Sequence, residues 1–292
     1  MNPLRGAAAR LGAAGVAALG VLTSIALACA LGPVLSPYGV DEQALAERNQ
    51  GPSWAHPFGT AELGEDVLTR VLGAGRISLL VGLATALVAT IVGAGLGLLA
   101  GWRGGWIDSV LARITDLFLI VPAFVVLIVL SLSFERVGAP QVVLILALLS
   151  WQPLFRLARA SALRTRELPY VQAARVAGAG GARIVRTHLL AAAVPEIAAF
   201  AALAVGVSML AESALSFLSL GIDPSGNPSW GTLMIGAEAT IEDRPWLTLF
   251  PGLMILMSVL AVSVVGDSVR AALVPGAPGA PGAAGRRRLS WR

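Results

Sequence analysis

Apolar residues along the chain are gathered into six long runs, separated by polar segments. The runs cover roughly residues 11–35, 77–101, 114–133, 137–155, 193–215 and 246–266. A helix needs about 20 mostly apolar residues to cross the hydrocarbon core of a membrane, and each run comes close to that length. The pattern therefore predicts an all-α polytopic membrane protein with six transmembrane helices and both termini on one side.

The first apolar run also has features of a secretory signal. Arg5 and Arg10 precede it, and Ala28-Cys29 faintly resembles the cleavage site of a lipoprotein. Because the apolar run continues beyond Cys29 to Leu35, we expect a retained first span and not a cleaved leader.

The composition agrees with a membrane protein and argues against several kinds of chemistry. Hydrophobic residues make up 56% of the chain, charged residues 13%, and the mean hydropathy is +0.78. All 21 basic residues are Arg, so the chain lacks the Lys with which a phosphate-binding P-loop reaches its nucleotide. A single Cys and two distant His predict neither a disulfide nor a metal cluster. We therefore expect no enzymatic activity, cofactor, metal or nucleic-acid partner.

The distribution of Arg predicts the orientation in the membrane. A cytoplasmic N-terminus would place sixteen of the 21 Arg in the inner connections and five in the outer ones. Cytoplasmic loops accumulate Arg and Lys, so this distribution favours an N-in, C-in topology. Residues 276–292 are rich in Pro and Gly and then basic, which predicts a disordered cytoplasmic tail near anionic headgroups.

The longest inner connection, residues 156–194, contains the segment YVQAARVAGAGGARIVRTHLL at positions 170–190. At helical spacing its small residues form one narrow stripe below Tyr170, while Gln172 and Arg175 point elsewhere. Gly180-Gly181 is expected to break this helix, and a second short helix would run from Ala182 to about Leu190. Two interpretations stay open, a docking face for a partner and a solvated amphipathic loop on the membrane surface. The stripe consists of Ala173, Ala174, Ala177 and Gly178.

This segment resembles the EAA loop of the membrane subunits of bacterial ABC importers. Gln172-Ala173-Ala174 stands at the E-A-A of that loop, and Gly178, Ile184 and His188 stand at its later Gly, Ile and His. Two positions depart from the pattern, because Gln172 replaces the acid and Ala191 stands where Pro is usual.

Four other stretches resemble the C-type permease subunit of the dipeptide and oligopeptide importers, in the order of that family. They are HPFGTAELGEDVLTRVLGAGRISLLVG at 56–82, GGWIDSVLARITDLFLIVP at 104–122, ESALSFLSLGIDPSGNPSWGTLM at 212–234 and PGLMILMSVLAVSVVGDSVRAALVP at 251–275.

The resemblance implies a type I ABC importer permease fold in a bacterial inner membrane. A homologous second permease would complete the pore, one or two ABC ATPase subunits would bind and hydrolyse ATP, and an extracytoplasmic binding protein would deliver di- or oligopeptides. Residues 1–55 would hold the first helix, 56–275 the core permease domain, and 276–292 the tail. The residues implied in coupling to the ATPase are Tyr170, Gln172, Ala173, Ala174, Ala177, Gly178, Ile184 and His188.

Candidates for the translocation pathway are less sharply defined. Ionisable residues inside a membrane are functional candidates by default, but Asp116 and Asp267 lie near interfaces where solvation is the preferred interpretation. For Glu212, solvation and exposure to a pore stay equally open. His56 is expected to organise a turn and not to bind a metal. The pathway candidates are Asp116, Pro122, Glu212, Ser213 and Phe217.

Two other functions remain open. A family member could import nickel or another small solute, because selectivity in this family resides largely in the binding protein. An ion-coupled secondary transporter would be expected to carry paired intramembrane charges or repeats of broken helices, and neither is evident in the sequence.

Overall fold

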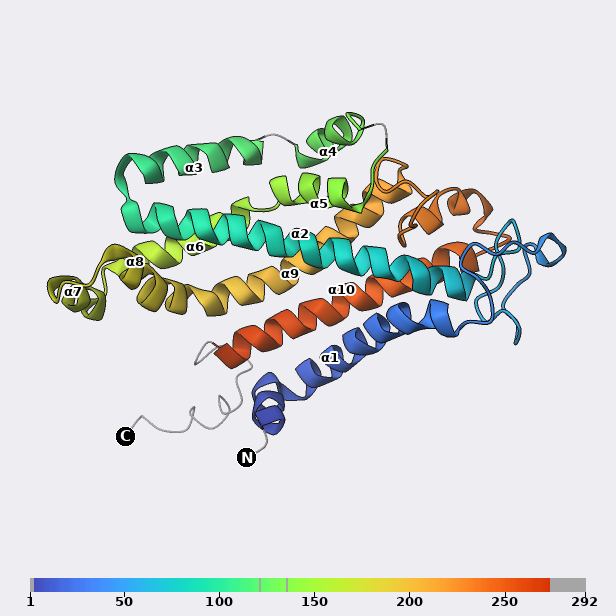
Figure 1. Ribbon diagram of the computed structural model, residues 1–292, viewed down its shortest axis with the longest axis horizontal. Helices are drawn as coiled ribbons and strands as arrows, with labels where there is room; N and C mark the ends of the chain where they lie inside the picture. The colour runs from blue at the N-terminus through green and yellow to red at the C-terminus, as the bar shows by residue number, and fades with distance from the viewer. Residues whose placement is uncertain (1–2, 121, 135, 274–292) are drawn as a thin grey trace, which may run out of the picture.

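The computed structural model describes residues 3–120, 122–134 and 136–273, and these residues form a long helical bundle without a strand (Figure 1). The predicted tail at 276–292 lies outside the described residues. The helices are α1 Pro3–Leu35, α2 Val67–Arg103, α3 Gly105–Ile120, α4 Ala123–Ser131, α5 Ala139–Leu148, α6 Gln152–Arg166, α7 Pro169–Val176, α8 Gly181–Ile184, α9 Leu190–Phe217 and α10 Trp246–Leu273, with the π-helix η2 Val185–Leu189 between α8 and α9 and the short 3-10 helices η1 Leu45–Glu47, η3 Thr232–Met234 and η4 Ala237–Thr240 in the loops.

Among the described residues, four continuous helical stretches are long and apolar enough to cross a membrane, and two bent pairs bring the number to six if each pair is one span. The stretches are Leu11–Leu35, Val67–Arg103, Gly181–Phe217 and Trp246–Leu273. The bent pairs are α3 with α4 and α5 with α6, so the six predicted spans correspond to these elements. The prediction of an all-helical polytopic fold is therefore confirmed for the described residues.

The third and fourth predicted spans are not continuous helices. Pro122 stands at the start of α4, with φ −59° and ψ 111°, and Pro153 stands in the first turn of α6, after a bend of 46° from α5. Proline lacks a backbone N–H and its ring clashes with the preceding helical turn, so each helix ends before its proline and a new one begins.

Small residues bring α2 and α6 into close contact. Gly93, Gly97 and Gly101 recur every fourth residue of α2 and face α6. A Cβ at Gly97 would lie 2.4 Å from the carbonyl oxygen of Phe155, so only glycine permits this approach. Such spacing is typical of helix packing in membranes, where close backbone contact replaces the hydrophobic effect as the driving force. The close packing of α6 on α2 fixes the direction of α6, and with it the position at which α7 begins.

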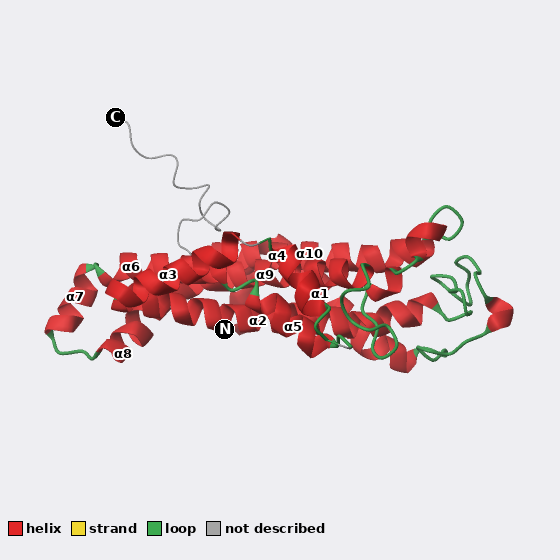
Figure 2. Cartoon of the chain, turned by 90° about the horizontal axis from the view of Figure 1, so that it is seen from above, coloured by secondary structure: helices red, strands yellow, loops and turns green. Residues whose placement is uncertain are grey.

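The two ends of the bundle differ in structure. At one end α7 and α8 project beyond the long helices, and both views show this (Figures 1 and 2). The start of α1 and the end of α10 lie toward the same end, as expected for an even number of spans. At the other end, the connections 36–66 and 218–245 fold over the ends of α2, α9 and α10. In the orientation predicted from the sequence, the projecting end is the inner end and this is the outer end, and the two ends are named accordingly below.

Candidate functional site

The projecting segment exposes the small residues of α7. Ala173 and Ala177 are exposed and Ala174 is half-buried, while Tyr170 above them is 50% exposed. Val176, at the end of the helix, is 91% exposed. Sequence reasoning did not select Val176, because it followed the small residues alone. This face of α7 is therefore a small apolar surface on which Ala173, Val176 and Ala177 are exposed.

The inner face of the same segment packs firmly on the bundle. Val171 from α7, Ile184 from α8 and Leu189 from η2 are all almost completely buried. They share one core cluster with Leu154 and Phe155 of α6. These apolar contacts join the segment to α6, so a force on α7 would be transmitted into the long helices.

Polar contacts hold the segment at its base. The Gln172 side chain donates from Nε2 to the carbonyl oxygen of Arg166 at 2.9 Å, at the end of α6. The Arg175 guanidinium carbon lies 4.9 Å from the ring centroid of Trp102 on α2, a separation at which cation–π attraction operates. Gln172 and Arg175 thus point away from the stripe, as predicted, but both contact the body of this chain. The contact of Arg175 with Trp102 was not foreseen, because nothing in the local pattern links α7 to the end of α2.

The end of α7 corrects one expectation from the sequence. The helix ends at Val176, and Gly178 has a φ of +84°, so the break comes before Gly180-Gly181. The N–H of Ala179 donates to the carbonyl of Ala174, and that of Gly178 to the carbonyl of Arg175. This pair of hydrogen bonds is the Schellman motif, in which glycine adopts a left-handed conformation without strain. Gly178 therefore terminates the stripe and does not continue the helix.

Ile184 also departs from its expected place. It was predicted to face the ATPase together with His188, but its side chain is only 1% exposed and is packed in the core cluster of this chain. The reason is that α8 turns its apolar residue into this cluster. His188 is half-buried, and its ring centroid lies 5.6 Å from that of Tyr170. Tyr170 and His188 thus connect the two short helices, and Ile184 anchors them.

A buried carboxylate lies near the outer end of α9. Glu212 is fully buried and accepts hydrogen bonds from Ser216 at 2.8 Å, from Ser78 of α2 at 3.3 Å and from Ser213 at 3.4 Å. Ser78 in turn accepts from the backbone N–H of Trp230 at 3.0 Å. Glu212 thus joins α2, α9 and the last outer connection from within the chain. In this conformation it is enclosed and does not line an open passage, so a role in the pathway stays a prediction.

The other pathway candidates do not converge on Glu212. Asp116 forms an ion pair with Arg156 at 2.7 Å, and both side chains are more than half exposed. Pro122 is exposed at the break before α4, and Phe217 is half-buried at the end of α9. Only Ser213 lies beside Glu212. The five residues therefore do not form one site within this chain.

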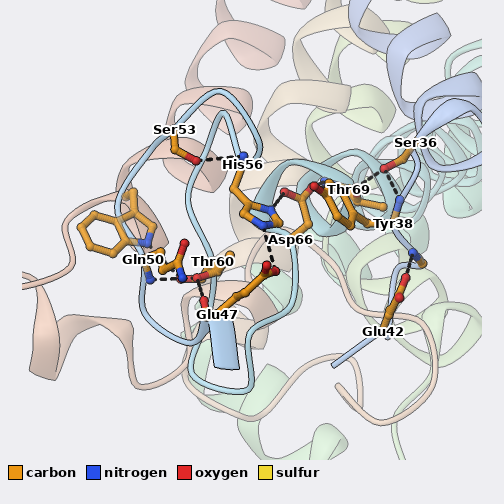
Figure 3. A network of polar contacts seen from close by, with 12 residues as sticks. Ser36, Tyr38, Glu42, Glu47, Gln50, Ser53, His56, Thr60, Asp66 and Thr69 are labelled. Atoms are coloured by element: carbon orange, nitrogen blue, oxygen red, sulfur yellow. Dashed lines mark hydrogen bonds and ion pairs between the residues drawn. The ribbon is translucent and has the colours of Figure 1, made fainter. Parts of the chain in front are cut away.

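The outer connection 36–66 is organised around His56, which is 3% exposed (Figure 3). The Nδ1 atom of His56 lies 2.9 Å from Asp66 and its Nε2 atom 3.2 Å from Glu47. Asp66 also caps α2, because its second oxygen accepts from the N–H and the hydroxyl of Thr69. The Tyr38 ring centroid lies 4.7 Å from that of His56. These contacts are the structural role predicted for His56. Asp66, which contacts His56, caps α2, and this cap explains why α2 begins at Val67, ten residues before the predicted span.

Comparison with known proteins gives the class of the chain. A family model described as the inner membrane component of binding-protein-dependent transport systems matches residues 93–277. A second, described as the N-terminal TM domain of oligopeptide transport permease C, matches residues 13–52. Together with the apolar helices and the projecting segment, these matches define a multi-pass inner membrane permease of an ABC importer.

Individual relatives cover nearly the whole chain. A putative peptide permease protein of Brucella suis is 36% identical over 266 residues, which cover 90% of this chain and 87% of that protein. The glutathione transport system permease protein GsiD of Pectobacterium atrosepticum is 36% identical over 82% of this chain and 80% of its own length. The dipeptide transport system permease protein DppC of Bacillus subtilis is 36% identical over 89% of this chain and 81% of its own length. The chain belongs to the family of binding-protein-dependent transport system inner membrane components.

Proposed function

We propose that this chain forms one half of the translocation pore of an ABC importer for di- or oligopeptides, with a homologous permease as the other half. The observation that carries this proposal is the exposed small face of α7, built on a rigidly packed base. Relatives named for dipeptides, oligopeptides and glutathione support a peptide substrate. An importer of nickel or another small solute is the nearest alternative.

The exposed face of α7 is where an ATPase subunit would dock. Small side chains permit close approach of a partner backbone, and the buried residues behind them leave little freedom for α7 to move alone. The segment continues through α8 and η2 into α9 as one helical stretch, Gly181–Phe217. Closure of two ATPases around ATP would therefore displace α7 and tilt α9 as a lever. That lever ends at Glu212 and the outer connections.

Reconstitution tests the class of transporter. The purified chain alone in vesicles should neither hydrolyse ATP nor take up peptide under any ion gradient. The complex with a second permease, ATPase subunits and a peptide-loaded binding protein should hydrolyse ATP and accumulate peptide. Uptake by the isolated chain driven by a proton or sodium gradient would contradict the proposal and support a secondary transporter.

The orientation follows from the same proposal, since α7 must face the cytoplasm. In a Cys29→Ser background, Gly226→Cys lies in the exposed outer connection and Ala177→Cys on the exposed face of α7. An impermeant maleimide added outside spheroplasts should label the first variant and spare the second. The reverse pattern would exclude docking of a cytoplasmic ATPase on α7.

A further inference from the structure

An open groove lies at the junction of α2 with the projecting segment, at the end of the bundle where α7 and α8 emerge. Its volume is about 610 Å³. The end of α2 forms one wall, and α8, η2 and the first residue of α9 form the other. None of the stripe residues of α7 lines it. The groove is lined by Leu98, Leu99, Trp102, Arg103, Gly181, Ala182, Val185, Arg186 and Leu190.

The lining combines an apolar wall with cationic groups. Leu99 and Leu190 belong to the lining and are 41% and 37% exposed. Arg103 and Arg186 are exposed, and neither forms an ion pair with another described residue. No acidic residue occurs among the lining residues. The groove therefore offers positive charge beside apolar surface and no negative charge.

The groove opens where the apolar run of α2 ends, which is where lipid headgroups are expected. It opens at the last turn of α2, a helix long enough to span the bilayer, and Trp102 stands there as aromatic residues do at membrane interfaces. Basic pockets between helices at the cytoplasmic side are a recognised binding mode for anionic headgroups. A second permease or an ATPase would have to supply acidic groups and an apolar ridge together, whereas an anionic phospholipid carries both in one molecule.

We propose that this groove binds an anionic phospholipid of the inner leaflet, with its phosphate between Arg103 and Arg186 and an acyl chain along Leu99 and Leu190. The same groove contacts α8, because Gly181 and Val185 belong to its wall. A bound lipid would fill the space between α2 and the projecting segment. The proposal does not depend on the transported substrate or on the ATPase.

Native mass spectrometry of the full chain tests this assignment, with phosphatidylglycerol and phosphatidylcholine of identical acyl chains as probes. The parent chain should retain phosphatidylglycerol preferentially. Each Arg near an anionic surface contributes roughly a few-fold to binding, so Arg103→Gln with Arg186→Gln should weaken retention by about tenfold or more. The variant with Lys at both positions should keep the preference. Thermal unfolding of each variant checks that the chain is folded.

The matched control removes the same charge from the same end of the bundle, outside the groove. Arg183→Gln with Arg270→Gln alters two exposed Arg and should leave retention unchanged. An equal loss in this control, or no loss in the groove variant, would overturn the proposal. Soluble glycerol phosphate should not displace the lipid, and equal competition would mean a phosphate site without a lipid. Displacement of the lipid by added ATPase subunits would mean that the groove is a protein interface.

Discussion

The outer and inner ends of the bundle are stabilised in different ways. At the outer end, Glu212, Asp66 and His56 are buried and hydrogen-bonded, His56 to Asp66 within one connection and Glu212 to Ser78, 134 positions away. At the inner end, α7 buries Val171 on the bundle and leaves its opposite face exposed. Glu212, Asp66 and His56 therefore find their partners within this chain, whereas the inner end presents an exposed apolar surface that a partner would complete.

This comparison predicts opposite responses to mutation. Changes at the outer end should reduce the stability of the isolated chain, because buried polar groups would lose their partners. Changes on the exposed face of α7 should leave stability almost unchanged and affect only the assembled transporter. Residues at the base of α7 should fall between these cases.

The largest loss of stability is expected for Glu212→Leu, because three serine hydroxyls would lose their common acceptor. A buried polar group left without a partner costs 1 to 3 kcal/mol, so the free energy of unfolding should fall by about 4 kcal/mol. Unfolding of the purified chain in detergent measures this change. Glu212→Gln keeps the size of the side chain and one acceptor oxygen, so its free energy of unfolding should fall clearly less. Equal losses of stability in the two variants would show that the hydrogen bonds of Glu212 are not the cause.

Ile184→Ala should come next, since it opens a cavity in the core cluster beneath the projecting segment. Truncation of a buried Ile to Ala costs 2 to 5 kcal/mol, and we expect about 3 kcal/mol here. The loss should appear as faster proteolysis between α7 and α8, and Ile184→Val should lose about 1 kcal/mol. Unchanged cleavage in the Ala variant would mean that Ile184 does not anchor the segment and would restore it as a docking residue.

A smaller effect is expected for His56→Ala in the outer connection. Loss of its contacts with Asp66 and Glu47 should lower the free energy of unfolding by about 1 to 2 kcal/mol. Trp54→Ala is the matched control, because this larger side chain is fully exposed in the same connection and should contribute almost nothing. If both variants lose equally, the connection is stabilised by contacts other than those of His56.

The sequence was a good guide to elements and a poor one to contacts between them. Apolar runs located the spans, and the small residues located the face of α7 that is exposed. The sequence did not show that Ser78 and Glu212 meet, because 134 positions separate them. Nor did it show the stacking of Arg175 on Trp102, for the same reason. Such pairs depend on tertiary packing, which local periodicity does not describe.

The errors at Gly178 and Ile184 have a more local origin. A helix of eight residues such as α7 is too short for periodicity to fix its end, and glycine suits both a tight packing position and a left-handed cap. Ile184 shows the converse ambiguity, because an apolar residue in a loop can face a partner or its own core. Only the tertiary packing of Ile184 in the core cluster decides between the two.

The smallest effect on stability is expected for Ala173→Leu, on the exposed face of α7. Ala173 is exposed, and Leu is a good helix former, so the isolated chain should unfold like the parent. Ala160→Leu, at an exposed position of α6 outside the stripe, adds the same volume elsewhere and serves as the control. Destabilisation by Ala173→Leu alone would mean that this face is already packed against the chain itself.

The most direct test of the account is the ATPase activity of the reconstituted complex carrying Ala173→Leu. Overpacking an interface costs about 1 to 3 kcal/mol, which corresponds to a loss of roughly tenfold or more in docking affinity. The variant should therefore bind less ATPase, or keep it and lose the stimulation of hydrolysis by peptide-loaded binding protein, while Ala160→Leu behaves like the parent. If the Ala173→Leu complex assembles, hydrolyses ATP and accumulates peptide like the parent, α7 is a solvated surface helix and the coupling role is wrong.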